Sequence, residues 1–337
     1  MEKSISQANN VTERKYWLDI ARIAAIFFVI LLHMSAWTIY SHPIATRSWM
    51  ICVGYNSLSR LCVPLLIMVS GALWLDPKKD VTPRYLFRHI LRLLVALIVW
   101  NLIYALFYTA RNYFATGELV FDPQTLSGGR FFSTGNYHLL FLYALVGLYL
   151  VIPLLRKIVT SKRTMEYMLI LSFLVSSVYP LLSQNQWISA HIMPFLTSAS
   201  PSFVAGFIGY FVLGYYLANV KLPKWLEYVL YTAGICGLAG TITGVTIQSS
   251  RAGMLSENFF SYTMLNIACC AAAGYYLIRR VAEGAKVSSS VGKALRLISR
   301  CCFGAYLCHD LIILCLTQFG VTPGILPLWI SIPAFAV

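Results

Sequence analysis

An arginine and a histidine lie inside the first long apolar stretch of the chain, at Arg22 and His33. Eleven residues at about 100° each complete roughly three helical turns and rise about 16 Å, so a helix places both on one face. Bilayer hydrocarbon tolerates such groups poorly, and a span that carries them usually turns them toward other helices or a wet cavity. Because imidazole is a frequent general base, the pair predicts a reaction site. An Asp19–Arg22 ion pair and a histidine bonded across helices are the structural alternative.

A second arginine, Arg60, lies in the next apolar stretch, four residues before Pro64. Proline has no N–H to donate, so it frees the carbonyl of Arg60 and is expected to bend this helix. We interpret Pro64 and Gly71 as structural residues. Arg60 is different, because a guanidinium near the middle of a membrane needs a partner or a polar ligand. We therefore predict a role for it in the reaction.

Two arginines one turn apart, Arg88 and Arg92, begin the third apolar stretch. They are expected either to anchor the helix at lipid headgroups or to clamp a phosphate, which guanidinium groups bind well.

Four further residues are candidates for substrate contacts. Tyr137 and His138 begin the fourth apolar stretch, where an interfacial aromatic residue and a helix cap are the structural alternatives. Tyr306 and His309 lie three residues apart in the ninth stretch, directly before Asp310. Hydrogen bonds between helices are the structural explanation for this second pair.

Composition identifies the environment of these residues. The 337 residues are 58% hydrophobic and only 11% charged, with a mean hydropathy of +0.70, whereas soluble domains average about 25% charged residues. The chain is therefore predicted to be an integral membrane protein. Its nine cysteines form no C-x-x-C pair, so we expect neither a disulfide nor a bound metal.

The hydropathy pattern predicts an all-α, polytopic membrane helix bundle with about ten transmembrane helices, each near the ~20 residues that a bilayer requires. Residues 1–15 form a cytoplasmic tail, and residues 16–337 form a single transmembrane domain that begins with an uncleaved signal anchor. The last helix is expected to be incomplete. The predicted spans are about 17–40, 49–75, 89–110, 138–155, 165–183, 201–219, 226–247, 260–278 and 301–319, with a tenth that begins near 325.

The net charge of +14 follows from topology. The N-terminal tail and alternate loops carry twenty of the 26 lysines and arginines, whereas the opposite loops carry four. By the positive-inside rule the N-terminus is cytoplasmic. This asymmetry accounts for the basic charge, so we expect no nucleic-acid partner.

Taken together, these segments resemble the membrane-bound acyltransferase-3 family of bacterial O-acyltransferases. The resemblance rests on an ordered set of short motifs that spans roughly residues 16–320, and the chain departs from the family pattern at Leu140 and Asp310. The matching pieces are Arg22-x10-His33, Arg60 with Val63-Pro64-Leu65 and Ser70-Gly71, Arg88 with Arg92, Tyr137-His138-Leu139 with Pro153, Gly209-Tyr210 with Gly214, and Tyr306-x-x-His309.

The resemblance implies an O-acetyltransferase of the bacterial inner (plasma) membrane, a multi-pass protein similar to short family members that modify a lipid-linked surface polysaccharide. It implies acetyl-CoA as the cytoplasmic acyl donor, no metal, and a glycan or lipid-linked glycan as the acceptor. Arg22 and His33 would belong to its active centre, with membrane lipids around it. The sequence does not indicate the oligomeric state.

With this reading, His33 is either a general base or a transient acyl carrier, and Arg60 neutralises the oxyanion. Arg88 and Arg92 hold the phosphates of the donor, and Tyr137, His138, Tyr306 and His309 contact the acceptor. The main alternative is a transporter or flippase of a small solute or lipid-linked sugar, since intramembrane His and Arg groups also build transport sites. A sensing or scaffolding module is the third class.

Overall fold

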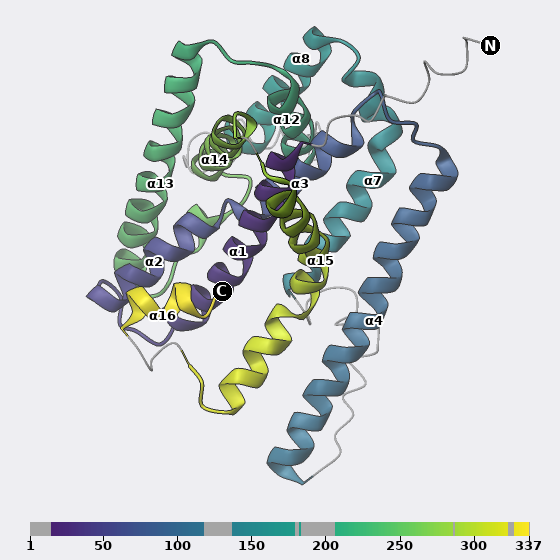
Figure 1. Cartoon of the computed structure of the whole chain (residues 1–337). Coiled ribbons are helices and arrows are strands. Elements are labelled where there is room, and N and C mark those ends of the chain that lie inside the picture. Colours follow the sequence, from purple (N-terminus) through teal and green to yellow (C-terminus); the bar gives the residue numbers. More distant parts are fainter. Residues whose placement is uncertain are drawn as a thin grey trace, which may run out of the picture.

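A computed structural model describes residues 15–117, 137–178, 182, 206–285, 287–322 and 327–336, and within them it contains helices and no strand. The chain is an all-α polytopic bundle (Figure 1). Its elements are α1 (Tyr16–Ile39), α2 (Arg47–Ser59), α3 (Cys62–Trp74), α4 (Pro83–Thr116), η1 (Tyr137–Leu139), α7 (Leu140–Ile158), α8 (Lys162–Phe173), the π-helical η2 (Leu174–Val178), α12 (Ile208–Asn219), α13 (Lys224–Ala252), η4 (Asn258–Phe260), α14 (Leu265–Glu283), α15 (Ser289–Gln318) and α16 (Leu328–Ala334).

Six stretches of the described chain are long and apolar enough to cross a bilayer. They are α1, the α2–α3 unit over Arg47–Trp74, α4, α7, α13 and α15. Parts of the predicted spans 165–183, 201–219 and the one that begins near 325 lie outside the described residues, and α14, at the predicted span 260–278, is not among the six, so the predicted count of ten stays a prediction.

Several helices differ in extent from the predicted spans, and their caps explain why. The predicted span 89–110 lies within α4, which begins after Thr82, whose hydroxyl accepts a hydrogen bond from the amide of Tyr85, and ends at the left-handed Gly117. The predicted span 301–319 is the second half of α15, which Ser288 caps. Hydropathy finds the apolar middle of a helix, whereas caps decide where the helix ends.

The predicted span 49–75 is interrupted at Arg60 and Leu61, between α2 and α3. Pro64 has no amide hydrogen to donate to the carbonyl of Arg60, so the helix cannot continue without a break. The amide of Leu65 bonds the carbonyl of Leu61 at 2.9 Å, which starts the new helix. The break holds Arg60 at the junction of two helices.

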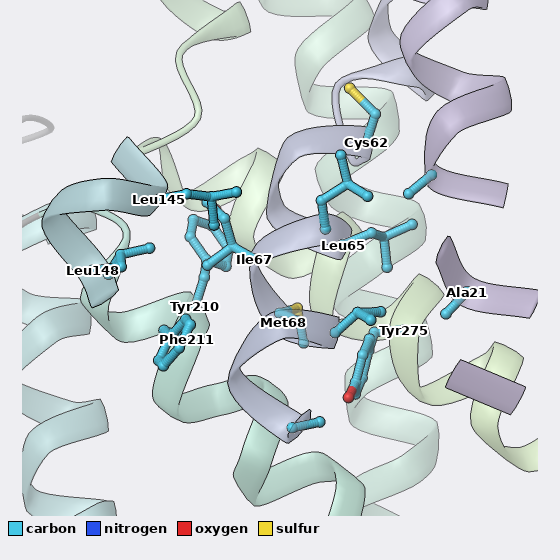
Figure 2. Close-up of a cluster of buried hydrophobic side chains, with 14 of the residues drawn as sticks. Ala21, Cys62, Leu65, Ile67, Met68, Leu145, Leu148, Tyr210, Phe211 and Tyr275 are labelled. Carbon is cyan, nitrogen blue, oxygen red and sulfur yellow. The ribbon is translucent and has the colours of Figure 1, made fainter. Parts of the chain in front are cut away.

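The core of the bundle is built around α3, which packs closely on α12 and on α1. Figure 2 shows Leu65 and Met68 of α3 among buried side chains that include Phe211 and Tyr275. The hydroxyl of Tyr275 donates a 3.0 Å hydrogen bond to the carbonyl of Gly214. In Figure 1, α4 runs along one side of the bundle and α13 along the opposite side.

Two glycines allow α3 and α12 to approach each other. A Cβ atom at Gly214 would overlap the carbonyl of Met68, and one at Gly71 would overlap the carbonyl of Phe211. Both obstacles are backbone atoms, which a rotamer change cannot move. Small residues at such crossings are typical of membrane helices, because close backbone contact replaces the hydrophobic effect that is missing in lipid.

We expect Gly214→Ala to lower the free energy of unfolding by about 3 kcal/mol, because the added methyl group forces the two backbones apart. Gly147→Ala is the matched control, because a Cβ atom at this α7 position meets no atom within 4 Å; it should change stability by less than about 1 kcal/mol. Titration with sodium dodecyl sulfate measures both variants. Equal stability of the two would contradict the close packing.

Candidate active site

Three histidines from distant parts of the chain meet inside the bundle. His33 is on α1, His138 on η1 and His309 on α15, and their side chains are buried, with residue exposures of 5%, 6% and 3%. The ring centroid of His309 lies 4.8 Å from that of His33 and 5.5 Å from that of His138. The rings of His33 and His138 are 6.3 Å apart. His309 therefore lies in contact with both other imidazoles.

Hydrogen bonds fix the orientation of this cluster. Nδ1 of His309 bonds the carbonyl of Tyr306 at 2.6 Å, so Nδ1 carries the proton and Nε2 is the basic nitrogen. The hydroxyl of Tyr306 donates to the carbonyl of His138. Oδ2 of Asp310 lies 3.6 Å from Nδ1 of His138. The turn of α15 from Tyr306 to Asp310 thus holds two of the three imidazoles.

Tyr104 of α4 inserts its hydroxyl into the same turn of α15. It donates to the carbonyl of Leu307 and accepts from the amide of Leu311, each at 3.1 Å. These two backbone groups ordinarily bond each other in an α-helix, and an inserted side chain is a known cause of helix bending. The axis of α15 changes direction along its length in Figure 1. Tyr104 therefore shapes the turn that carries His309 and Asp310.

A cavity of about 880 Å³ adjoins the cluster. His33, His138 and Tyr306 line it, together with Arg60. Its volume is within the range of about 300–1,000 Å³ that small-molecule sites occupy. Nε2 of His309 is buried and has no hydrogen-bond partner among the described residues, which leaves one basic nitrogen of the cluster able to take a proton.

Arg60 is held in the wall of this cavity by α1 and by its own helix. Its Nε donates to Oδ1 of Asn56 at 3.0 Å, and Nδ2 of Asn56 donates to Oγ of Ser35 at 3.2 Å. The guanidinium lies over the ring of Phe260, 4.4 Å from its centroid. Asn56 therefore links Arg60 to the helix that carries His33.

Arg22 and His33 both face α15, but they meet it at different heights. Nη1 of Arg22 donates to Oγ of Ser299 at 2.9 Å and lies 4.0 Å from Asp19. We call the end of the bundle where α1 starts the inner end, and the end where α1 stops the outer end. Arg22 lies toward the inner end and is not among the described residues that line the cavity, whose lining on α1 begins at Val29.

The inner end gathers positive charge. Partial burial lowers the pKa of Lys79, and the cations of Arg22 and Arg156 lower it further, against the opposing effect of Asp76. Arg156 donates hydrogen bonds to the carbonyls of Trp74 and Asp76, each at 2.9 Å, and so holds the loop between α3 and α4. This end of the bundle favours an anionic ligand.

The structure separates the other predicted residues from the cavity or leaves them undescribed. Arg88 and Arg92 are exposed on α4, away from the buried Leu86, Leu93 and Leu97. The side chain of Tyr137 lies outside the described residues. His309 and Asp310 do not line the cavity, since neither is among its described lining residues; they lie next to the lining residues His33 and His138. No group of three or more His, Cys, Asp or Glu in the described ranges is arranged to hold a metal ion.

Sequence reasoning missed four residues of the site. Asn56 lies four residues before Arg60, a spacing that places the two on one helical face and that signals their contact. Glu257 is the acidic residue among those that line the cavity, and it lies in a loop predicted to face outward. Trp37 and Tyr104 carry no comparable signal, because aromatic residues in spans are most often packing residues.

The fold and the site define a multi-pass membrane protein with a large internal cavity beside three clustered histidines. A protein-family model described as an acyltransferase domain matches residues 15–337. The chain belongs to this acyltransferase-3 family and is a membrane acyltransferase. No curated protein and no solved structure matches it.

A double-mutant cycle tests the link between Asn56 and Arg60. We expect Arg60→Ala to lower the rate of acyl transfer by about 10²-fold or more, as loss of a charge-stabilising donor does, and Asn56→Ala by about tenfold. The double variant should be no slower than Arg60→Ala, because Asn56 acts through Arg60. Thr38→Ala, which removes a buried hydroxyl of α1 that bonds the carbonyl of Met34 in its own helix, is the control. Additive losses would show that the two residues act independently.

Proposed function

We propose that this acyltransferase moves an acetyl group from cytoplasmic acetyl-CoA to a hydroxyl of a cell-surface glycan or of its lipid-linked precursor, in the bacterial inner membrane. The observation that carries the proposal is the placement of His33. Its imidazole lies in the wall of a large cavity and contacts the His309 ring. A base beside a chamber large enough for a sugar is the arrangement that transfer to a hydroxyl requires.

The chemistry at His33 can follow two routes. As a general base, His33 takes the proton of the acceptor hydroxyl while its oxygen attacks the thioester carbonyl. As an acyl carrier, it first forms a bond to the acetyl carbon with loss of CoA, and the hydroxyl then displaces the imidazole. In both routes the C–S bond breaks, a new C–O bond forms and the hydroxyl proton ends on the CoA thiol.

Arg60 and His309 assist either route. The tetrahedral intermediate carries an oxyanion, and the Arg60 guanidinium in the cavity wall stabilises it. His309 contacts His33 and has a basic Nε2, so it can hold a proton during the reaction. His138, Tyr306 and Tyr137 belong to the acceptor side of the site.

The donor is assigned to the inner end. The phosphates of acetyl-CoA need cations, and this end has Arg22, Lys79 and Arg156 around the loop between α3 and α4. Arg88 and Arg92 lie one turn apart and exposed on the first part of α4, where they can reach a large anion at the membrane surface. The thioester then passes between the helices toward His33.

Replacement of His33 tests the assignment. We expect His33→Ala to reduce acetylation by about 10³-fold, the loss typical of a removed general base, with the fold retained. The measurement is transfer of radiolabelled acetyl from acetyl-CoA in phospholipid nanodiscs, with the mass of the cell-surface glycan as a second readout. His42→Ala, outside this cavity, is the control. A folded His33→Ala variant that acetylates at the wild-type rate would refute the role of His33.

The Arg88/Arg92 pair has a separate test. We expect Arg88→Gln/Arg92→Gln to weaken binding of acetyl-CoA about tenfold or more while the rate at saturating donor stays near the wild-type value, because the pair contacts phosphates and not the reacting atoms. The control is Lys221→Gln/Lys224→Gln, which removes two positive charges at the same end of the bundle but between α12 and α13. If the two double variants bind acetyl-CoA with equal affinity, Arg88 and Arg92 serve only to anchor the helix at the membrane surface.

A further inference from the structure

The outer part of the cavity contains aromatic side chains and a carboxylate that the reaction at His33 does not use. Trp37 on α1 and Tyr40 directly after its last residue both follow His33, and both line the cavity. They are 40% and 70% exposed, respectively. Trp37 lies one helical turn beyond His33 and Tyr40 about two turns beyond, so their Cα atoms are about 6 and 10 Å further along the axis.

A loop that follows α13 brings a carboxylate to these rings. Glu257 lines the same cavity, and its Oε1 accepts a 2.8 Å hydrogen bond from the hydroxyl of Tyr40. This bond ties the end of α1 to a loop more than 200 residues later in the chain. It uses one carboxylate oxygen, and the other remains able to accept hydrogen bonds.

The lining argues against a simple interfacial aromatic belt. Belt residues contact lipid headgroups around a protein, whereas Trp37 and Tyr40 line a cavity that continues to His33. Phe207 and Tyr262 line the same space. The mouth therefore offers flat apolar faces beside an exposed carboxylate, inside one chamber.

This combination matches the chemistry of a pyranose. A sugar ring has C–H-rich faces that pack on aromatic rings, and its edge carries hydroxyl donors for a carboxylate. A ring stacked at Trp37 lies one helical turn from the level of His33, so one of its hydroxyl groups can reach the imidazole.

We propose that Trp37, Tyr40 and Glu257 form a pyranose-binding site at the outer mouth, which holds the acceptor sugar for the reaction at His33. The inference rests on the proposed function for the fate of the sugar, but binding can be measured without any donor. Trp37 stacks on the ring and Glu257 accepts from its hydroxyl groups. Tyr40 positions Glu257 through the 2.8 Å bond.

Saturation-transfer-difference NMR of the full chain in phospholipid nanodiscs tests this site. Glycosidic detergents are avoided because their sugar headgroups would compete. The probes are methyl β-D-glucopyranoside and methyl N-acetyl-β-D-glucosaminide at millimolar concentration. We expect wild-type protein to saturate the ring protons of at least one probe, and Trp37→Ala and Glu257→Gln to weaken this binding at least tenfold.

The matched control is Trp329→Ala, which removes an exposed tryptophan of α16 that is not among the described residues of the cavity lining. It should bind the probes like the wild type. Binding of neither probe by wild-type protein, or equal binding by all four proteins, would overturn the sugar site. Transfer from acetyl-CoA is then measured separately. Sugar binding without acetyl transfer would refute the proposed function alone, and transfer with an unchanged acceptor KM in Trp37→Ala and Glu257→Gln would refute the sugar site alone.

Discussion

The contact between α1 and α15 sets the relative positions of Arg22, His33 and His309. A guanidinium or an imidazole inside an apolar bundle loses its hydration and needs polar partners there. α15 supplies them at two heights, with Ser299 bonded to Arg22 and His309 against His33. The two contacts are separated by eleven residues on α1 and ten on α15, so the helices run in the same direction with nearly matched rise. A slip of one turn between them would leave both groups without these partners.

The break between α2 and α3 allows one segment to serve both the core and the chamber. Past the break, α3 packs against α12 at Gly71 and Gly214, where the backbones touch. At the break, Arg60 lies outside both helices, and Asn56 holds its side chain in the cavity wall. Pro64 lies four residues after Arg60 and therefore places the break between the cavity residue Arg60 and the packed helix α3. The rigid crossing thus helps to fix the position of a charged side chain in the wall of the cavity.

Local sequence signals predicted those features of the molecule that arise within a single helix. The helical bundle, the common face of Arg22 and His33 and the bend before Pro64 all follow from hydropathy, helical phase or proline chemistry. The buried face of α4, which carries Leu86, Leu93 and Leu97, was not predicted, because apolar residues such as Leu91 and Leu94 also occupy its exposed side. The meeting of His33, His138 and His309 does not follow from spacing, because more than 100 residues separate each from the next. The insertion of Tyr104 into α15 is likewise a tertiary event that no local pattern marks.

The separation of Arg22 from the cavity bears on the choice between the two routes at His33. Among the described residues, the chamber reaches the level of Val29, Val63 and Tyr306, and Arg22 lies beyond it toward the inner end. In the proposed reaction, a general-base route needs thioester and sugar at His33 together, so a path for the donor from the inner end would have to be open while the outer mouth is occupied. An acyl-carrier route needs them in turn, and the inner passage can close before the sugar enters. Such alternation keeps the two sides of the membrane separated at all times. The described cavity lining includes Tyr40 but not Arg22, which is the arrangement that we would expect of the proposed acyl-carrier route with the sugar side open.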